Sequence, residues 1–217
     1  ADYMLILSAD DYLLPGALSR SADLMDAHPE VGITFGRVVV LEDGRPRKGF
    51  PLLNVTDESD RRIFKGLRFI ELSGSHDIVA TPTAVVRTEL QKRLGGYRPE
   101  LPHSGDMEMW LRVAAHASVG ILGAYQAVYR RHTGNMSLSY TAKTWLPDLQ
   151  QRKAAFEIFF QTCSQAIPGP YRLHRKLLRL LACDAIGFAS SAFNEGEMDL
   201  AKQLVEFALG ICPQIKM

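Results

Sequence analysis

The sequence predicts an α/β fold with a helical carboxyl-terminal extension, and three observations lead to this. A short apolar run, Tyr3 to Leu7, predicts a strand and ends close to two adjacent acids. Strand-like and helical patterns then alternate through the first two thirds of the chain. From Thr141 onward only helical periodicity is found. We therefore expect an α/β domain over residues 1–140 and a helical extension over residues 141–217.

The first apolar run sets the expected position of a site. An uninterrupted run of this kind predicts a parallel strand buried on both faces, with Asp10 and Asp11 at its carboxyl end. Ligands bind outside such strand ends, and carboxylate oxygens suit Mg²⁺ or Mn²⁺ holding a phosphate. The alternative is an acidic turn before a helix, with Asp11 as the capping residue and Pro15 at the first helical position. The sequence leaves both interpretations open.

The following elements are predicted from spacing and from turn residues. Leu18, Ala22 and Met25 recur at helical spacing. In chain order we expect that helix to close at His28-Pro29, then a strand over Val31 to Leu41, a hairpin turn at Glu42 to Arg45, a mobile surface loop from Arg45 to Arg62, a helix around Phe64 to Leu72, a strand around Ile78 to Val86, and a helix from Thr88 to Gly95-Gly96.

A second group of polar residues surrounds Asp106. A loop containing Gly95, Gly96, Pro99 and Pro102 delivers Asp106 to the start of a helix. The apolar face of that helix comprises Met107, Trp110, Leu111 and Ala114. An acid at this place can face a cleft and act as a general base. The alternative is that Asp106 only caps the free N–H groups of the helix.

A third group follows the apolar strand Val119 to Val128. Arg130, Arg131 and His132 stand at its end, before a loop of small residues. Guanidinium groups bind phosphate oxygens in a fork, and a neutral imidazole can ligate a divalent metal. The group therefore suits a diphosphate, although a solvated basic strand end is the alternative.

In this order, the motifs closely resemble those of family 2 glycosyltransferases, which have the GT-A fold. They are Asp10-Asp11-Tyr12-Leu13-Leu14-Pro15, Leu94-Gly95-Gly96-Tyr97, Gly105-Asp106-Met107-Glu108-Met109-Trp110-Leu111-Arg112 and Tyr129-Arg130-Arg131-His132. The resemblance implies inverting transfer from a nucleotide-sugar donor to a saccharide or other acceptor hydroxyl, in polysaccharide or glycoconjugate synthesis.

The resemblance also implies a role for each matching residue. Asp10 and Asp11 would hold Mg²⁺ or Mn²⁺ and the nucleotide diphosphate. Asp106 would be the catalytic base, Arg131 and His132 would contact the diphosphate, and His132 could also contact the metal. Self-association and peripheral membrane association of the full-length protein are compatible with the resemblance.

Two departures from the family pattern affect these expectations. Members often have Asp-x-Asp-Asp at the first motif, whereas Ser8 occupies the leading position here. In the family, the amino-terminal βα units that hold the nucleoside precede the strand that corresponds to Tyr3–Leu7, whereas only Ala1 and Asp2 precede it in this sequence. We therefore expect a carboxyl-terminal fragment of the GT-A domain that is inactive alone and self-associates through an exposed sheet edge or its helices.

The extension contains three expected helices, over Thr141 to Cys163, Tyr171 to Phe193 and Glu197 to Ile211. The last two resemble a tetratricopeptide-like hairpin, which cannot bury its apolar face alone. It would pack on the α/β domain as a helical cap, on another chain, or on further repeats.

Composition bears on partners and compartment. A formal net charge of +1 gives no general reason to expect nucleic acid as a partner. Three widely spaced cysteines and the lack of a long apolar run or leader predict a cytoplasmic protein. Two other classes stay open: a non-catalytic assembly domain, and a metal-dependent nucleotidyltransferase, which uses similar acids and basic phosphate contacts.

Overall fold

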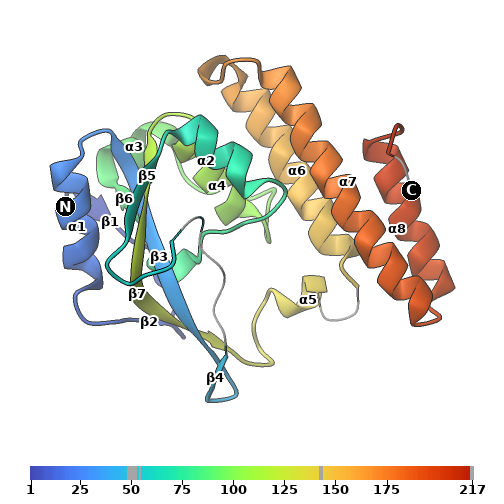
Figure 1. Ribbon diagram of the computed structural model, residues 1–217, viewed down its shortest axis with the longest axis horizontal. Coiled ribbons are helices and arrows are strands. Elements are labelled where there is room, and N and C mark those ends of the chain that lie inside the picture. The colour runs from blue at the N-terminus through green and yellow to red at the C-terminus, as the bar shows by residue number, and fades with distance from the viewer. Residues whose placement is uncertain (48–52, 54, 142–143, 216–217) are drawn as a thin grey trace. The chain divides into compact units, whose positions relative to one another are not determined.

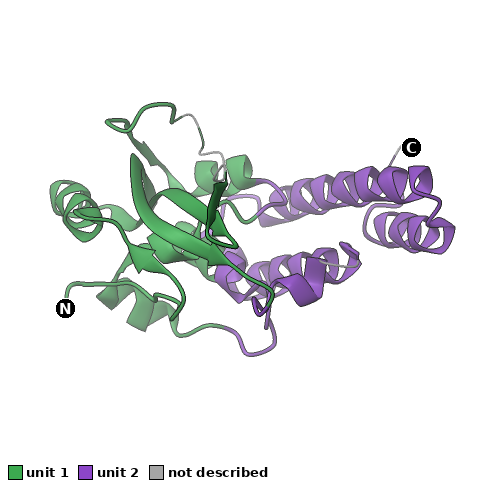
Figure 2. Cartoon of the chain, turned by 90° about the horizontal axis from the view of Figure 1, so that it is seen from below, with its two compact units in different colours: residues 1–73, 77–97, 109–133 green, residues 74–76, 98–108, 134–217 purple. Residues whose placement is uncertain are grey.

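The computed structural model describes residues 1–47, 53, 55–141 and 144–215, which form a mixed α/β structure in two compact units (Figure 2). The first unit comprises Ala1–Ser73, Asp77–Tyr97 and Met109–Thr133. The second comprises Gly74–His76, Arg98–Glu108 and Gly134–Met217. The α/β class predicted from the sequence is confirmed.

The first unit is built on a seven-stranded mixed sheet (Figure 1). Its path is β1-β6-β3-β7-β2, with β4 paired to β3 and β5 paired to β7. Among the strands that the structure describes, only β3 and β7 pair in parallel, from Val31 opposite Ser118 to Glu42 opposite Arg131. The strands are β1 (Tyr3–Met4), β2 (Tyr12–Leu13), β3 (Val31–Glu42), β4 (Arg45–Arg47), β5 (Arg61–Phe64), β6 (Val85–Arg87) and β7 (Ser118–Arg131).

The other regular elements of this unit are helices. They are α1 (Ala17–Ala27), α2 (Gly66–Ser73), the 3₁₀ turn η1 (Thr81–Thr83), α3 (Thr88–Leu94) and α4 (Gly105–Ala114), whose first residues belong to the second unit. Phe35 of β3 and Phe69 of α2 meet edge to face, with ring centroids 5.9 Å apart. Both are buried, as aromatic side chains on a central strand and on the helix that covers it should be.

The first strand differs from its prediction. β1 contains only Tyr3 and Met4 and pairs antiparallel with β6. Ile6 and Leu7 are 50% and 39% exposed. The expectation of a parallel strand buried on both faces is therefore wrong. β1 lies at the end of the sheet with one neighbour, and an apolar run does not by itself distinguish an end strand from a central one.

The capping interpretation of the acidic turn is also wrong. Helix α1 begins at Ala17 and its N-cap is Gly16, with φ of 78°, so neither Asp11 nor Pro15 has the expected place in it. The strand β2 lies between the acids and this helix. Leu18 is exposed, and the buried face of α1 is formed by Ala17, Ser21, Leu24 and Met25.

Residues 45–62 are more regular than predicted where the structure describes them. The hairpin turn is present, with φ of 50° at Asp43 and 76° at Gly44. The strands β4 and β5 lie at the two ends of the expected loop, so the prediction of irregular structure is wrong at both ends. Residues 48–52 and 54, which the predicted loop includes, lie outside the described residues. The strand expected over 78–86 is reduced to β6, because η1 occupies the positions around Pro82.

The second unit contains helices that correspond to the three expected in the extension, namely α6 (Leu146–Cys163), α7 (Pro170–Asn194) and α8 (Met198–Ile211). The first of them begins at Leu146 instead of Thr141, which is the last residue of a short helix that was not expected, α5 (Leu138–Thr141). The 3₁₀ turn η2 (Ser164–Ala166) follows α6. Helix α7 packs against both α6 and α8. Among the described residues, we find no helix with the length and apolar character that crossing a membrane requires.

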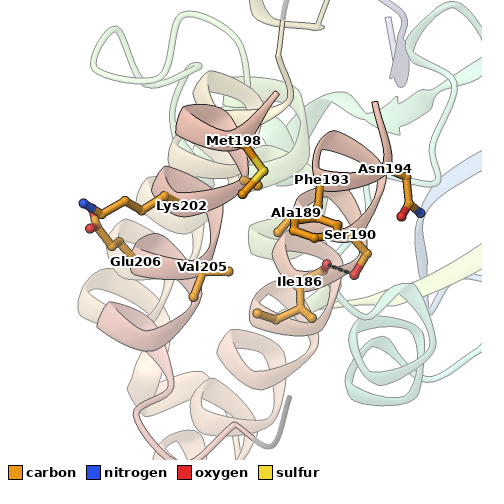
Figure 3. A pocket seen from close by; sticks show the side chains of 10 residues that line it. Ile186, Ala189, Ser190, Phe193, Asn194, Met198, Lys202, Val205 and Glu206 are labelled. Carbon is orange, nitrogen blue, oxygen red and sulfur yellow. Dashed lines mark hydrogen bonds between the residues drawn. The ribbon is translucent and has the colours of Figure 1, made fainter. Parts of the chain in front are cut away.

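The α7–α8 hairpin has an apolar groove of about 600 Å³ (Figure 3). Phe193 and Met198, on either side of the turn, are 59% and 56% exposed. Lys202 and Glu206 of α8 are the charged residues along the groove. The described part of the hairpin thus leaves part of its apolar surface uncovered.

Close packing at Gly66 gives a testable expectation about stability. A Cβ atom built there would lie 1.6 Å from the backbone oxygen of Ala114. Gly66→Ala therefore forces backbone apart at the start of α2, and we expect it to lower the free energy of unfolding by about 3 kcal/mol. Urea unfolding measures this. The matched control is Gly187→Ala in α7, where nothing lies within 4 Å. The control should stabilise the protein by about 0.5–1 kcal/mol, and equal effects at the two sites would contradict the packing argument.

Candidate functional site

The acidic turn and the basic strand end lie side by side in the first unit. Asp10 and Asp11 occupy a turn between β1 and β2, closed by the Asp11 amide donating to the Ser8 carbonyl at 3.1 Å. The next residue, Tyr12, pairs with Val128 of β7. This antiparallel pairing brings the acids beside Arg130 and His132. Two groups predicted separately from the sequence therefore share one corner of the sheet.

Asp11 is the buried acid of this corner, with 7% of its surface exposed. Its Oδ1 accepts a hydrogen bond from the Arg130 backbone amide at 2.9 Å. Its Oδ2 is buried and has no hydrogen-bond partner. Burial raises the pKa of Asp11, the Arg130 amide lowers it, and the charge of Asp10 raises it further. Such a group is stabilised by a cation, which makes Oδ2 a candidate ligand.

Asp10 is more exposed and already has cationic neighbours. Its Oδ2 lies 3.0 Å from Nε2 of His132, and this contact, ahead of the charge of Arg130, holds the pKa of Asp10 below its ordinary value. Nε of Arg130 also donates to the backbone carbonyl of Asp10. Asp10 is therefore ionised at neutral pH, as a metal or phosphate site requires.

Arg131 faces the other side of the corner. Its Nη1 lies 3.8 Å from Oε1 of Glu42, whose other carboxylate oxygen, Oε2, accepts from Nε of Arg47 at 3.1 Å. The corner encloses a pocket of about 390 Å³, lined by Asp10, Leu41, Asp43, Gly44, Arg130, Arg131 and His132. Strand β3 supplies Leu41 and the β3–β4 turn supplies Asp43 and Gly44. The sequence interpretation assigned none of these three residues to the site. The parallel pairing of β3 with β7, which ends both strands at one edge, is what places them there.

The residues of this corner suit a divalent cation that is bound partly by protein carboxylates and partly by phosphate oxygens. Within the described part of the chain, no three or more His, Cys, Asp or Glu side chains gather as a complete metal site. Mg²⁺ does not need one, because it is commonly held by one or two carboxylates, substrate phosphates and water. The lone Oδ2 of Asp11 and the ionised Asp10 meet that requirement. Nε2 of His132 is engaged with Asp10, so metal ligation by His132 would need that contact to break.

Asp106 is where the sequence predicts it along the chain. It lies in the first turn of α4, half-buried, and its Oδ1 accepts from the Met107 amide at 2.8 Å. The expected apolar face of α4 is buried, including Trp110, which packs edge to face on Tyr97. Asp106 belongs to the second unit, whereas Asp10 and Asp11 belong to the first.

Arg112 of α4 has a structural role in the Gly95-Gly96 loop. It is 3% exposed, and it donates to the carbonyls of Leu94 at 2.6 Å and Gly96 at 2.9 Å. These bonds satisfy carbonyl groups at and just beyond the end of α3. A buried cation thus fixes the beginning of the loop that the sequence identified by its glycines and prolines.

Comparisons with known proteins add no family assignment. No protein-family model matches this chain, and no curated protein matches its sequence.

The buried state of Asp11 predicts an unusual effect on stability. Because its pKa is raised, the folded protein takes up a proton here at higher pH than the unfolded chain does. The ionised carboxyl therefore costs stability above its folded pKa, and the cost disappears below the unfolded value of about 3.9. We expect Asp11→Asn to raise the melting temperature at pH 7, and the gain to shrink as the pH falls toward 4. Thermal melts at both values measure it.

The control for this change is Asp23→Asn, the same substitution at an exposed position of α1. It should leave the melting temperature within experimental error at both pH values. A destabilised Asp11→Asn at pH 7, without metal, would show that the acid contributes to the fold.

Proposed function

We propose that this chain is the metal- and diphosphate-binding part of a GT-A glycosyltransferase similar to family 2. The observation that carries the proposal is the corner where Asp10 and Asp11 meet Arg130, Arg131 and His132. It combines carboxylates, one of them with a buried oxygen that lacks a partner, and cationic groups in a pocket of about 390 Å³. The donor is a nucleotide-sugar and the acceptor a saccharide or other hydroxyl.

Each residue of the corner has a distinct task in this proposal. Asp10 and Asp11 hold Mg²⁺ or Mn²⁺, which when bound offsets the charge that grows on the departing diphosphate. Arg130 keeps the acidic turn in place through its backbone amide and guanidinium. Arg131 and His132 contact the diphosphate oxygens, Arg131 by leaving Glu42 for a stronger anionic partner.

Asp106 is the proposed base. It removes the proton from the acceptor hydroxyl as the oxygen attacks the anomeric carbon from the face opposite the leaving diphosphate, which inverts the configuration there. The assignment rests on the resemblance of the α4 motif and on the place of Asp106 in the first turn of that helix. The three cysteines are free, which supports a reducing compartment such as the cytoplasm.

Calorimetry on the full-length gene product tests the donor site. We expect Mn²⁺ to be required for binding of a nucleoside diphosphate, tested as a panel of UDP, GDP, ADP, CDP and dTDP. An enzyme site would bind its nucleotide with a dissociation constant of about 1 μM to 1 mM. Binding that is equally strong with EDTA would contradict the metal role, and no binding of any member would favour the non-catalytic assembly domain.

Product analysis separates the two reaction classes. Glycosyl transfer releases a nucleoside diphosphate, whereas nucleotidyl transfer releases pyrophosphate. We expect nucleoside diphosphate from a nucleotide-sugar, and pyrophosphate from a nucleoside triphosphate would overturn the assignment.

A further inference from the structure

The segment that leads into α4 is fastened to α6 immediately before Asp106. All residues concerned belong to the second unit. Ser104 Oγ donates to the Gln151 carbonyl at 2.8 Å, and the backbone oxygen of Ser104 accepts from the Glu108 amide at 3.1 Å. The same residue thus joins the first turn of α4 to α6. His103 precedes it and is held more extensively.

The imidazole of His103 is fixed at its edge and on its face. Nε2 lies 2.9 Å from Oδ1 of Asp148, and the ring stacks on Tyr140 with centroids 4.2 Å apart and planes 7° from parallel. The backbone amide of His103 donates to Oε1 of Gln151 at 3.2 Å. Only 14% of the side chain is exposed. These contacts restrain the ring.

The second carboxylate oxygen of Asp148 contacts a buried cation, Arg152. Nη2 of Arg152 lies 2.8 Å from Oδ2 of Asp148, and Nη1 of Arg152 contacts Asp184 at 3.2 Å and the Ser75 carbonyl at 3.0 Å. Burial raises the pKa of Asp148, but the bond from His103 and the charge of Arg152 outweigh it and hold that pKa below its ordinary value. An ionised carboxylate only accepts, so His103 donates through Nε2–H.

We propose that His103 is a positioning residue, whose hydrogen bond to Asp148 holds the segment that delivers Asp106 to the first turn of α4. This inference rests on the proposed role of Asp106 as the base. His103 does not touch the reacting atoms. It acts by reducing the freedom of residues 103–106, because a general base must stay within hydrogen-bond reach of the proton that it removes.

Hydrogen exchange on this chain tests the positioning role without requiring activity. His103→Phe keeps a ring to stack on Tyr140 but removes the donor to Asp148. A hydrogen bond to a charged group is worth about 1.5–3 kcal/mol, so we expect amides of residues 103–108 to exchange about 10–100-fold faster. His103→Gln retains an N–H donor and should restore most of the protection. The amides of α8 should be unchanged in both.

The matched control is His174→Phe in α7. His174 also stacks on an aromatic ring, Phe160, at 4.5 Å, but its buried Nε2 has no hydrogen-bond partner. The same substitution there should leave residues 103–108 as protected as in the wild type. If His103→Phe does not fold, Tyr140→Leu removes the stacking partner and leaves the buried charges intact. Tyr140→Leu should also increase the exchange rates of residues 103–108, but by a smaller factor than His103→Phe.

Turnover of the full-length gene product distinguishes this inference from the proposed function. We expect His103→Phe to lower kcat about tenfold with little change in KM for the donor, and His103→Gln to recover it. The inference would be overturned if His103→Phe left exchange in residues 103–108 unchanged, or if it accelerated exchange throughout the second unit. It would also be overturned if His103→Phe accelerated exchange in residues 103–108 but kept the wild-type kcat. A wild type that shows no glycosyl transfer would reject the proposed function, and with it the catalytic meaning of any ordering seen by exchange.

Discussion

Asp106→Asn should lower kcat of the full-length gene product by about 10²–10⁴ while the protein stays folded. The amide has nearly the shape of the carboxylate and can still accept from the Met107 amide, but it cannot take a proton from an acceptor hydroxyl. Release of nucleoside diphosphate in the presence of acceptor gives kcat. Circular dichroism and thermal melting report the fold.

Glu100→Gln provides a matched acid-to-amide control in the exposed loop before α4. It should retain wild-type turnover and stability. Near-wild-type turnover in Asp106→Asn would remove Asp106 from the mechanism. Unfolding without a separate loss of turnover would instead support the view that the acid mainly stabilises the start of the helix.

Asp10→Asn combined with Asp11→Asn should abolish metal-dependent binding of the nucleoside diphosphate. Amide oxygens are weak ligands for hard divalent cations compared with carboxylates, and the double change removes both charges from the corner. Titration calorimetry with Mn²⁺ and the nucleotide that binds the wild type measures the loss. The strand pairing of β2 with β7 should survive, because it is made by backbone groups.

Asp23→Asn serves again as the control, since it removes one carboxylate from an exposed position of α1 in the same unit. Its nucleotide affinity should equal that of the wild type. Unchanged binding in the double variant would reduce Asp10 and Asp11 to turn-forming residues and would leave the phosphate site to Arg131 and His132.

Local signals predicted much of the fold. The β-branched run from Val31, the turn at Asp43-Gly44 and the end of α3 at Gly95 all depend on neighbouring residues, and the structure has each of them. Which strands pair with one another, in contrast, is not decided by residues that are close in the sequence. That β1 has one partner, and that β5 pairs with β7 at all, is decided by residues far along the chain. The sequence pattern therefore missed β5 and misjudged the burial of Ile6 and Leu7.

The candidate site was predictable in its chemistry and less so in its geometry. Acids and basic residues at element ends identified Asp10, Asp11, Arg131 and His132 as candidates. The β3–β4 turn joins them only through strand pairing across the sheet. The bond from His103 to Asp148 was missed for a similar reason, because the two residues are 45 positions apart and no periodicity connects them.

The pairing of β2 with β7 has a consequence for biosynthesis. Asp11 meets Arg130, and Asp10 meets His132, across 119 and 122 positions of the chain. At about 5–20 residues per second, the ribosome needs roughly 6–24 s to extend the chain from the acids to their partners. Closing so long a loop is also slow compared with forming a helical hairpin. During that interval the acidic turn has no basic strand beside it. Nascent chains stopped before residue 118 should therefore lack the corner altogether, whereas chains released after residue 132 can assemble it.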